Sequence, residues 1–331
     1  MPHLPLWIPV AQRTRGSAVE MVHTGGAVAL DAAGRVLWAA GDPQAPTYFR
    51  SSAKPWQALP LVKSGAADQF GFSNDELALS CASHDGEPIH AATAAGMLKK
   101  LGLTPDALLC GAQPPYNKAA AKALVAAGEK YSALHNNCSG KHSGMLASCL
   151  KNSWPINNYL DYDHPLQAAI RIELGEATGL DAKSLPWGVD GCGVPTYFLP
   201  LAAMARAFGK LGGATATTNA PLARLADAMR AHPLLIEGHG GFDTALMTVT
   251  QGRLVSKRGG AALGCVGTRD GEGLVVKCGD GNAEVVPVLV MAALEKVGWL
   301  TPAESAELAP FSVVPLTNVV GKQIGELRAI I

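Results

Sequence analysis

Short apolar runs bounded by glycine lie at both ends of this chain, and alanine- and leucine-rich segments with helical spacing fill its middle. Near the start, GGAVALDAAGRVLWAAGD holds two apolar runs around a polar turn, which predicts a β-hairpin over about residues 26–40. Near the end, GRLVSKRGG, AALGCVGT and GLVVKCGDG repeat that character. Because such strands must share a buried face, we expect one antiparallel sheet built from N- and C-terminal segments.

Helices are expected between those strands, and one more after the last of them. Helical spacing marks the segments at about 89–101, 117–129, 143–151, 164–178, 199–211, 218–231 and 284–298. Asp163 is expected to cap the helix that Pro165 opens. The predicted fold class is therefore α+β, with a sheet lobe of about residues 1–60 plus 240–331, a helical lobe of about 61–239, and a cleft between them.

Charge and apolar content exclude several classes of partner. The 331 residues include 27 basic and 27 acidic side chains, so no basic surface for nucleic acid and no acidic tail is expected. The longest apolar run, residues 285–294, is far shorter than the ~20 residues that span a bilayer, and the first residues do not resemble a signal peptide. Seven cysteines in a chain of this length favour reduced thiols. We expect a cytoplasmic protein that binds a small molecule, without membrane or nucleic-acid partners.

The segment YFRSSAKPWQAL, residues 48–59, places Ser51 three residues before Lys54. In a helix this spacing brings a hydroxyl and an amine to one face, where a neutral lysine can activate a serine nucleophile. Burial, or the neighbouring cation Arg50, would lower the pKa of the lysine. The alternative is that Ser51 or Ser52 only caps the helix that begins here.

A second polar segment, LSCASHDGEPIH at residues 79–90, follows a hydrophobic run. Its hydroxyl groups, Ser83 among them, could relay a proton, and turn or capping roles are the alternative.

Two further loops, HNNCSGKHSGML at 135–146 and VDGCGVPTYF at 189–198, each put a cysteine beside glycines. Such thiols can form a disulfide, bind a soft metal, or include a nucleophile with His142 as its base. A reducing compartment argues against the disulfide. The metal pattern is weak because neither loop holds a C-x-x-C pair.

Taken together and in order, FRSSAKPWQ, SHDGEPIH, HNNCSGKHSGML, DGCGVPTYFLPL and GFDTALM resemble the L-asparaginase II family of rhizobial type. The resemblance covers nearly the whole chain. It implies one asparaginase domain over residues 1–331, a fold similar to serine β-lactamases and glutaminases, a homodimer, and hydrolysis of L-asparagine to L-aspartate and ammonia.

The resemblance also implies roles for individual residues. Ser51 would be the nucleophile and Lys54 its base, and the full catalytic set would be Ser51, Lys54, Ser83 and Lys257. The cofactor would be Zn²⁺, held by Cys138, Lys141 and Cys192. A lysine must be neutral to bind zinc, and the metal itself would lower its pKa. The substrate would be bound or oriented by Arg50, His142 and Asp190.

Two departures from the family pattern affect these assignments. The late turn SKRGGAALG is longer than usual and lacks a glutamate, so Arg258 is the alternative to Lys257. Gly241 stands where a larger basic residue is expected. Three other functions stay open: a zinc amidohydrolase in which metal-bound water attacks, a penicillin-recognising serine hydrolase, and an amino-acid-binding protein without catalysis.

Overall fold

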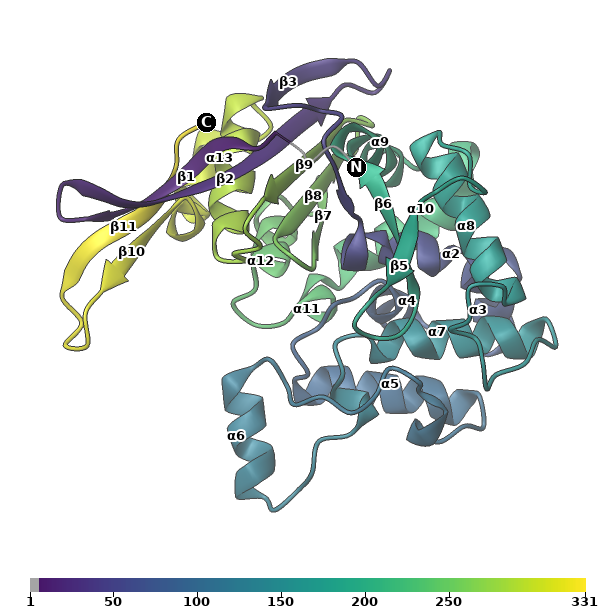
Figure 1. The fold of residues 1–331 in the computed structure, drawn as a ribbon. Helices are drawn as coiled ribbons and strands as arrows, with labels where there is room; N and C mark the ends of the chain where they lie inside the picture. Colours follow the sequence, from purple (N-terminus) through teal and green to yellow (C-terminus); the bar gives the residue numbers. More distant parts are fainter. Residues whose placement is uncertain (1–5) are drawn as a thin grey trace. The chain divides into compact units, whose positions relative to one another are not determined.

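The two ends of the chain share one antiparallel sheet, as predicted (Figure 1). The fold is that of a computed structural model, which describes residues 6–331. The strands run in the order β10-β11-β1-β2-β9-β8-β7, and β3 also pairs with β2. Their bounds are β1 Ile8–Arg15, β2 Ala18–Leu30, β3 Val36–Ala40, β7 Leu254–Gly259, β8 Leu263–Thr268, β9 Gly273–Cys278, β10 Val313–Thr317 and β11 Gln323–Ala329.

The chain divides into two compact units, and neither is one continuous stretch. The first joins the chain up to Ser52 with Phe198–Gly213 and Ala245–Ile331, and the second joins Ala53–Tyr197 with Ala214–Thr244. The predicted lobes differ from this division by placing residues 53–60 and 240–244 on the sheet side and 198–213 on the helical side. That the units are lobes of one asparaginase domain stays a prediction.

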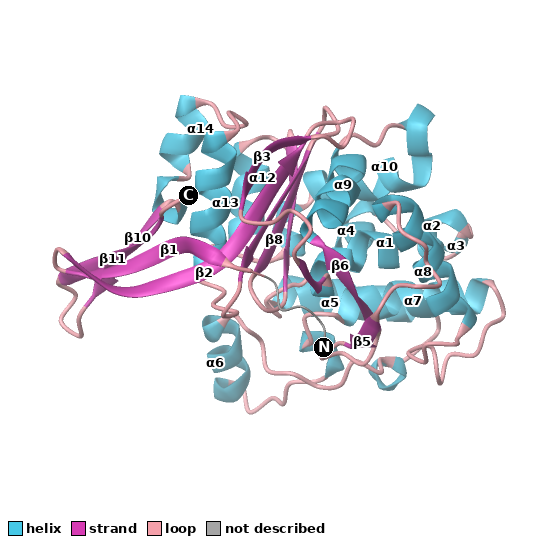
Figure 2. Ribbon diagram, turned by 45° about the horizontal axis from the view of Figure 1, so that its top comes forward, coloured by secondary structure: helices cyan, strands magenta, loops and turns pink. Residues whose placement is uncertain are grey.

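In the first unit, helices cover both faces of the sheet (Figure 2). Gly267 and Gly273 are cross-strand partners, and a Cβ at these positions would lie 2.0 Å from Phe208 O and 1.8 Å from Ala205 O of α9, Leu201–Gly212. Gly264 points to the other face, where a Cβ would lie 2.7 Å from a methyl group of α13, Val285–Lys296. Alternating strand residues therefore pack on alternate helices, and glycine permits the close approach.

The second unit is mostly helical, and α7 lies at its centre. Residues 139–149 of α7 are all buried, and α7 packs against α4 and α5. The helices of this unit are α1 Lys54–Gln57, α2 Leu59–Lys63, α3 Ala66–Gln69, α4 Asn74–Ser80, α5 Pro88–Lys100, α6 Lys118–Ala126, α7 Ser139–Lys151, α8 Pro165–Thr178, α10 Ala216–Ala231 and α11 Pro233–Ile236. Every predicted segment in this part of the chain is thus helical, with α7 starting earlier than expected.

The remaining elements are short. Strand β6, Pro195–Pro200, pairs with two short strands. In the first unit its residues 198–200 pair with β4, Pro46–Tyr48. In the second unit its residues 195–197 pair with β5, Trp187–Val189. Helix α12 is Phe242–Val249 and α14 is Pro302–Glu307. The 3₁₀ turns are η1 Arg50–Ala53, η2 Pro105–Ala107, η3 Ala133–His135 and η4 Ala309–Phe311.

Two details of the predicted fold are wrong. Asp163 does not cap α8: the N-cap is His164, whose ring accepts a hydrogen bond from Leu166 N at 3.1 Å. The helix α13 does not follow the final strand, because β10 and β11 come after it. β10 contains Pro315, which an edge strand tolerates but which weakens a strand pattern in sequence.

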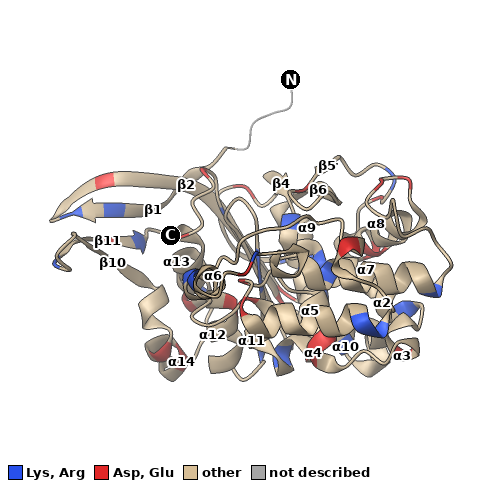
Figure 3. Cartoon of the chain, turned by 90° about the horizontal axis from the view of Figure 1, so that it is seen from below, with Lys and Arg blue, Asp and Glu red and all other residues tan. Residues whose placement is uncertain are grey.

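Lysine and arginine are interspersed with acidic residues along the elements of both units (Figure 3). Between residues 6 and 331, no helix combines the length and the apolar character that crossing a membrane requires. All seven cysteines are buried, and their reduced state stays a prediction.

Candidate active site

In the first unit, the serine segment lies against the end of β7. Ser52 Oγ donates to the carbonyl oxygen of Lys257 at 3.1 Å. A Cβ at Gly259 would lie 2.7 Å from Ser52 Oγ, and one at Gly260 would lie 3.2 Å from the guanidinium carbon of Arg50. Two glycines thus let the late turn approach the serine segment. Lys257 is 1% exposed, and its Nζ donates to the carbonyl oxygen of Arg258 at 2.7 Å.

The backbone at the start of this segment is unusual. Arg50 has a φ of 50°, in the left-handed region that residues other than glycine rarely adopt. Ser51 follows it in η1 and is half-buried. The N-cap of α1 is Ala53, without a side-chain capping bond, so the interpretation of Ser51 or Ser52 as a helix cap is wrong. Left-handed backbone at a bulky residue is typical of functional sites.

In the second unit, the amine of Lys54 is surrounded by three oxygens. Nζ donates to the carbonyl oxygen of Ala82, to Ser83 Oγ at 2.9 Å and to the carbonyl oxygen of Asn137 at 3.0 Å. Lys54 is 1% exposed, and burial lowers its pKa, which favours the neutral amine. A neutral amine keeps two hydrogens. Its lone pair can then accept a proton from a neighbouring hydroxyl group.

Cys138, Lys141 and Cys192 also come together in the second unit. Cys138 is the N-cap of α7 and Lys141 lies in its first turn, so a spacing of three residues puts both on one helix face. Cys192 comes from the turn between β5 and β6. Lys141 Nζ donates to Cys192 Sγ at 2.9 Å. All three side chains are buried.

The charges of this trio follow from its contacts. The hydrogen bond from Cys192 is the largest cause that holds the pKa of Cys138 well below its usual value, and it acts with the charge of Lys141 and a hydrogen bond from Lys54 against the effect of burial. The same bond, with burial, raises the pKa of Cys192. Burial alone would lower the pKa of Lys141, but the two sulfurs outweigh it and raise that pKa. The trio without metal is thus a thiolate, a thiol and an ammonium group.

The donor set of the trio fits Zn²⁺. Zinc binds sulfur and nitrogen, and three protein ligands leave a fourth tetrahedral position for water or substrate. To bind here it would displace the protons of Lys141 and Cys192, as zinc does when it binds amine and thiol ligands.

A sequence profile of the L-asparaginase II family matches residues 11–329 of the 331. The chain belongs to the L-asparaginase II family. It is therefore an enzyme, an amidohydrolase that acts on L-asparagine. None of the curated proteins compared with the chain matches it.

The residues predicted for this asparaginase site fall into one group on each unit. Lys54 and Ser83 lie together in the second unit, with the trio of sulfur and amine ligands, whereas Ser51 and Lys257 belong to the first. The pairing of Ser83 with Lys257 stays a prediction. The predicted choice of Lys257 over Arg258 also stays a prediction.

The predicted substrate residues differ in their surroundings. His142 is fully buried, its Nδ1 lies 2.8 Å from the hydroxyl of Tyr159, and burial lowers its pKa to about 4. His142 is thus neutral at physiological pH and is oriented by Tyr159. Asp190 accepts from Gly191 N at 2.7 Å, and its charge helps to raise the pKa of Lys141. An anion therefore lies beside the candidate metal ligands.

The sequence analysis missed several groups that hold the predicted site residues in place. Ala82 and Asn137 hold Lys54 through their backbone carbonyl oxygens, and a backbone contact cannot be recognised from the residue type. His84 Nε2 lies 2.9 Å from Ser139 Oγ, and its Nδ1 accepts from Gly86 N, so the proton is on Nε2. This hydrogen bond joins the residue after Ser83 to the residue after Cys138. The position of His84 and Ser139 next to these two predicted site residues was the sequence signal that could have found them.

Proposed function

We propose that this enzyme hydrolyses the side-chain amide of L-asparagine through an acyl-enzyme on Ser51. The observation that carries the proposal is the buried Lys54, three residues along the same segment, whose burial favours the neutral amine and whose Nζ is hydrogen-bonded to Ser83. A serine nucleophile needs an adjacent base, and a lysine can serve only when it is neutral.

In the first step, Ser51 Oγ attacks the amide carbon while Lys54 Nζ takes the hydroxyl proton. The carbon–nitrogen bond then breaks, and the nitrogen takes a proton through Lys54 and Ser83 and leaves as ammonia. Water attacks the remaining aspartyl ester, its proton passes back along the same groups, and Ser51 is released. The backbone N–H of Ser51 would bind the developing oxyanion, a contribution of about 3 kcal/mol in comparable sites. Lys257 would assist Ser83 in the proton transfer.

The α-amino and carboxylate groups of asparagine need charged partners. Arg50 would bind the carboxylate, and Asp190 the ammonium group, with His142 held in place by Tyr159. Zn²⁺ on Cys138, Lys141 and Cys192 would supply a Lewis-acid anchor for the same end of the substrate. A fixed anchor disfavours glutamine, because one extra methylene moves the amide by ~1 Å and such a shift can cost about a hundredfold in rate.

Ammonia release from L-asparagine, with L-glutamine in parallel, tests the nucleophile. Ser51→Ala should lower kcat by at least about 10⁴-fold. Ser52→Ala is the matched control, because Ser52 is the adjacent hydroxyl and its Oγ bonds only a backbone carbonyl among the contacts seen. Intact-mass spectrometry should also find an aspartyl adduct on Ser51 in a slowed variant, Lys257→Ala. Full activity in Ser51→Ala, lost on chelation, would instead favour attack by metal-bound water.

Zinc content tests the metal ligands separately. Cys192→Ser should lose one zinc ion per chain and raise KM for asparagine. Cys149→Ser removes a buried thiol further along α7 and should lose none. Equal zinc content in the two variants would remove Cys192 from the proposal. A homodimer and a cytoplasmic location stay predictions, which light scattering and cell fractionation would check.

A further inference from the structure

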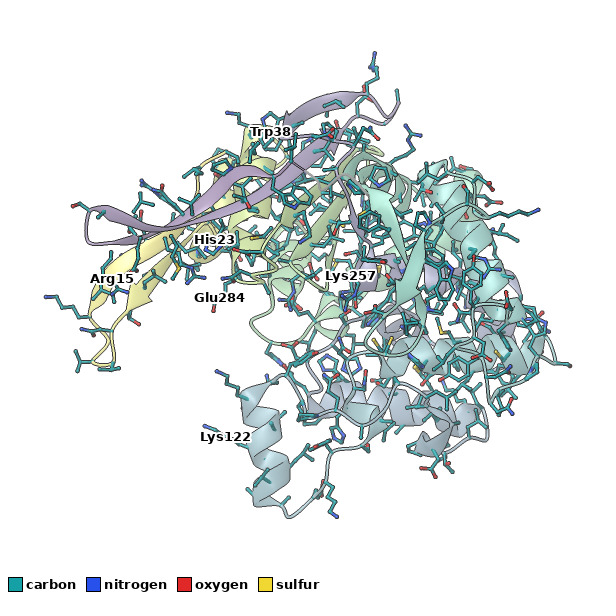
Figure 4. The ribbon with its side chains drawn as sticks, viewed as in Figure 1. Arg15, His23, Trp38, Lys122, Lys257 and Glu284 are labelled. Atoms are coloured by element: carbon teal, nitrogen blue, oxygen red, sulfur yellow. The ribbon has the colours of Figure 1, made fainter. Side chains whose placement is uncertain are left out.

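Three different metal-binding side chains, none of them assigned a role above, converge in the first unit. They are His23 of β2, which Figure 4 labels, Cys278 at the end of β9, and Asp280 two residues beyond it. Their ligand atoms all lie within 4.8 Å of one another. One Asp280 oxygen lies 2.7 Å from His23 Nδ1, and the other accepts from Cys278 Sγ at 2.9 Å.

The strand register explains why they meet. Gly25 of β2 pairs with Cys278 of β9 in an antiparallel ladder. His23 lies two residues before Gly25 and Asp280 two after Cys278, so the same register places them opposite each other. Gly279 N donates to Thr24 O, which continues the ladder past its last pair. Residues two apart share a face of the sheet, so the three side chains project to one side.

We propose that His23, Cys278 and Asp280 form a second binding site for a divalent cation of borderline softness, with Zn²⁺ as the best fit. Nitrogen, sulfur and oxygen donors together favour zinc over magnesium or calcium. His23 and Cys278 are 5% and 0% exposed, whereas the side chain of Asp280 is 45% exposed and gives access from solvent. The site does not depend on the proposed catalytic mechanism.

The dimensions need a small adjustment. Bond lengths of about 2.3 Å to sulfur and 2.0 Å to nitrogen or oxygen put tetrahedral ligand atoms about 3.3–3.5 Å apart. The contacts of 2.7 Å and 2.9 Å must therefore open by roughly half an ångström. Asp280 supplies this movement because it is exposed and lies beyond the end of its strand.

The protons and charges also balance. On binding, the thiol proton of Cys278 passes to solvent, and the imidazole of His23 carries a hydrogen on Nε2, which leaves Nδ1 to bind the metal. The thiolate and the carboxylate together then offset the charge of the cation. Burial and the neighbouring Asp280 raise the pKa of the Cys278 thiol to about 12, so the metal must compete with that proton.

Arg13 opposes the metal-bound form. Its Nε donates to His23 Nε2 at 3.2 Å, and its Nη2 bonds Glu284 at 2.6 Å. A metal-ligating histidine normally donates its second N–H to an acceptor, whereas here a donor faces that nitrogen. Arg13 must turn away when metal binds, so it weakens the site. Arg13→Gln supplies an amide oxygen as an acceptor and should tighten cation binding about tenfold.

Cobalt(II) is the probe, because thiolate ligation to Co²⁺ gives a charge-transfer absorption. The background protein carries Cys138→Ser and Cys192→Ser, which removes the other pair of thiols proposed as ligands. We expect one equivalent of Co²⁺ to produce the band and to raise the melting temperature. Adding Cys278→Ser should abolish both effects, and adding Cys265→Ser, a buried thiol of β8 in the same sheet, should leave them.

A background protein that gives no band, or a band that survives Cys278→Ser, would overturn the proposal. Asp280→Asn is the second variant if Cys278→Ser does not fold, since it changes an exposed ligand and should weaken binding at least about tenfold. Unchanged Co²⁺ affinity in Asp280→Asn, or weaker binding in Arg13→Gln, would also contradict the proposed ligand set. Failure of the asparaginase mechanism would leave all of these results unaffected.

Discussion

Glu87 is a buried carboxylate that holds three segments together near Ser83. One of its oxygens accepts from Asn117 Nδ2 at 3.0 Å and from His239 N at 2.8 Å, and the other lies 2.5 Å from His239 Nδ1. Ser83 N donates to the carbonyl oxygen of Ile236, the last residue of α11, so the helix that leads into the loop of His239 also supports the serine. The position of one candidate catalytic residue thus depends on a charge four residues further along the chain.

Glu87→Gln keeps the shape but removes the charge, and should destabilise the protein by about 2 kcal/mol at neutral pH. Burial alone would raise the pKa of Glu87, but the hydrogen bonds from His239 outweigh it and lower that pKa. A lowered pKa means that the stabilisation is complete above the ordinary glutamate range and is lost as pH falls through the lowered value.

Urea unfolding at neutral pH and in acid measures this difference. The difference in the free energy of unfolding between wild type and Glu87→Gln should disappear in acid. Glu176→Gln, whose side chain is 66% exposed, is the control and should change stability little at either pH. A gap of equal size at both pH values would show that the charge of Glu87 is not responsible.

At the scale of elements, the approach of α4 to α7 sets the geometry of the second-unit site. α4 ends just before Ser83, and α7 begins just after Cys138. A Cβ at Gly140 would lie 2.4 Å from the carbonyl oxygen of Leu79, so the lack of a side chain at this position lets α4 and α7 approach closely. The backbone and the side chain of Leu79 both border this position, so the contact at Gly140 sets how closely α4 approaches the helix that carries the candidate metal ligands.

Gly140→Ala should force the helices apart, destabilise the protein by about 1–3 kcal/mol and weaken zinc binding. Gly96→Ala in α5 is the matched control, because its Cβ would meet a single atom, Glu76 Oε1 at 3.9 Å. That substitution should stabilise the helix by about 0.5–1 kcal/mol. Thermal unfolding with and without zinc distinguishes the two variants. Equal changes in melting temperature in Gly140→Ala and Gly96→Ala would contradict the role of Gly140.

For the molecule as a whole, the first unit is assembled from distant segments. β11 pairs with β1, and Leu327 of β11 is fully buried. The last strands of the chain therefore complete the sheet that the first strands begin. A chain without them would leave the backbone edge of β1 exposed, and an exposed edge pairs readily with other chains.

A chain that ends at residue 312 should therefore unfold at lower temperature and aggregate. The control is Val320→Ser in the turn between β10 and β11, where the side chain is 82% exposed. Size-exclusion chromatography with light scattering separates the outcomes. A shortened chain as monodisperse and as stable as the full one would show that β10 and β11 are dispensable.

The sequence predicted the elements whose apolar pattern is local. The hairpin near residue 30, the strands β7 to β9 and the central helices follow from periodicity, and the order of five motifs identified the family. It missed β1, β10 and β11. β10 and β11 are mostly exposed or half-buried, so neither strand has the fully buried apolar face that makes a strand easy to recognise in sequence.

The sequence by itself determined which chemical groups were present: Ser51 three residues before Lys54, two cysteines beside glycines, and a lysine within the first of those loops. The tertiary structure decided what surrounds them. It buried Lys54 among two carbonyls and Ser83, and it placed His23 opposite Asp280. The reason is physical: periodicity is read over a few neighbouring residues, whereas burial, register and pKa depend on groups that folding brings together from distant parts of the chain.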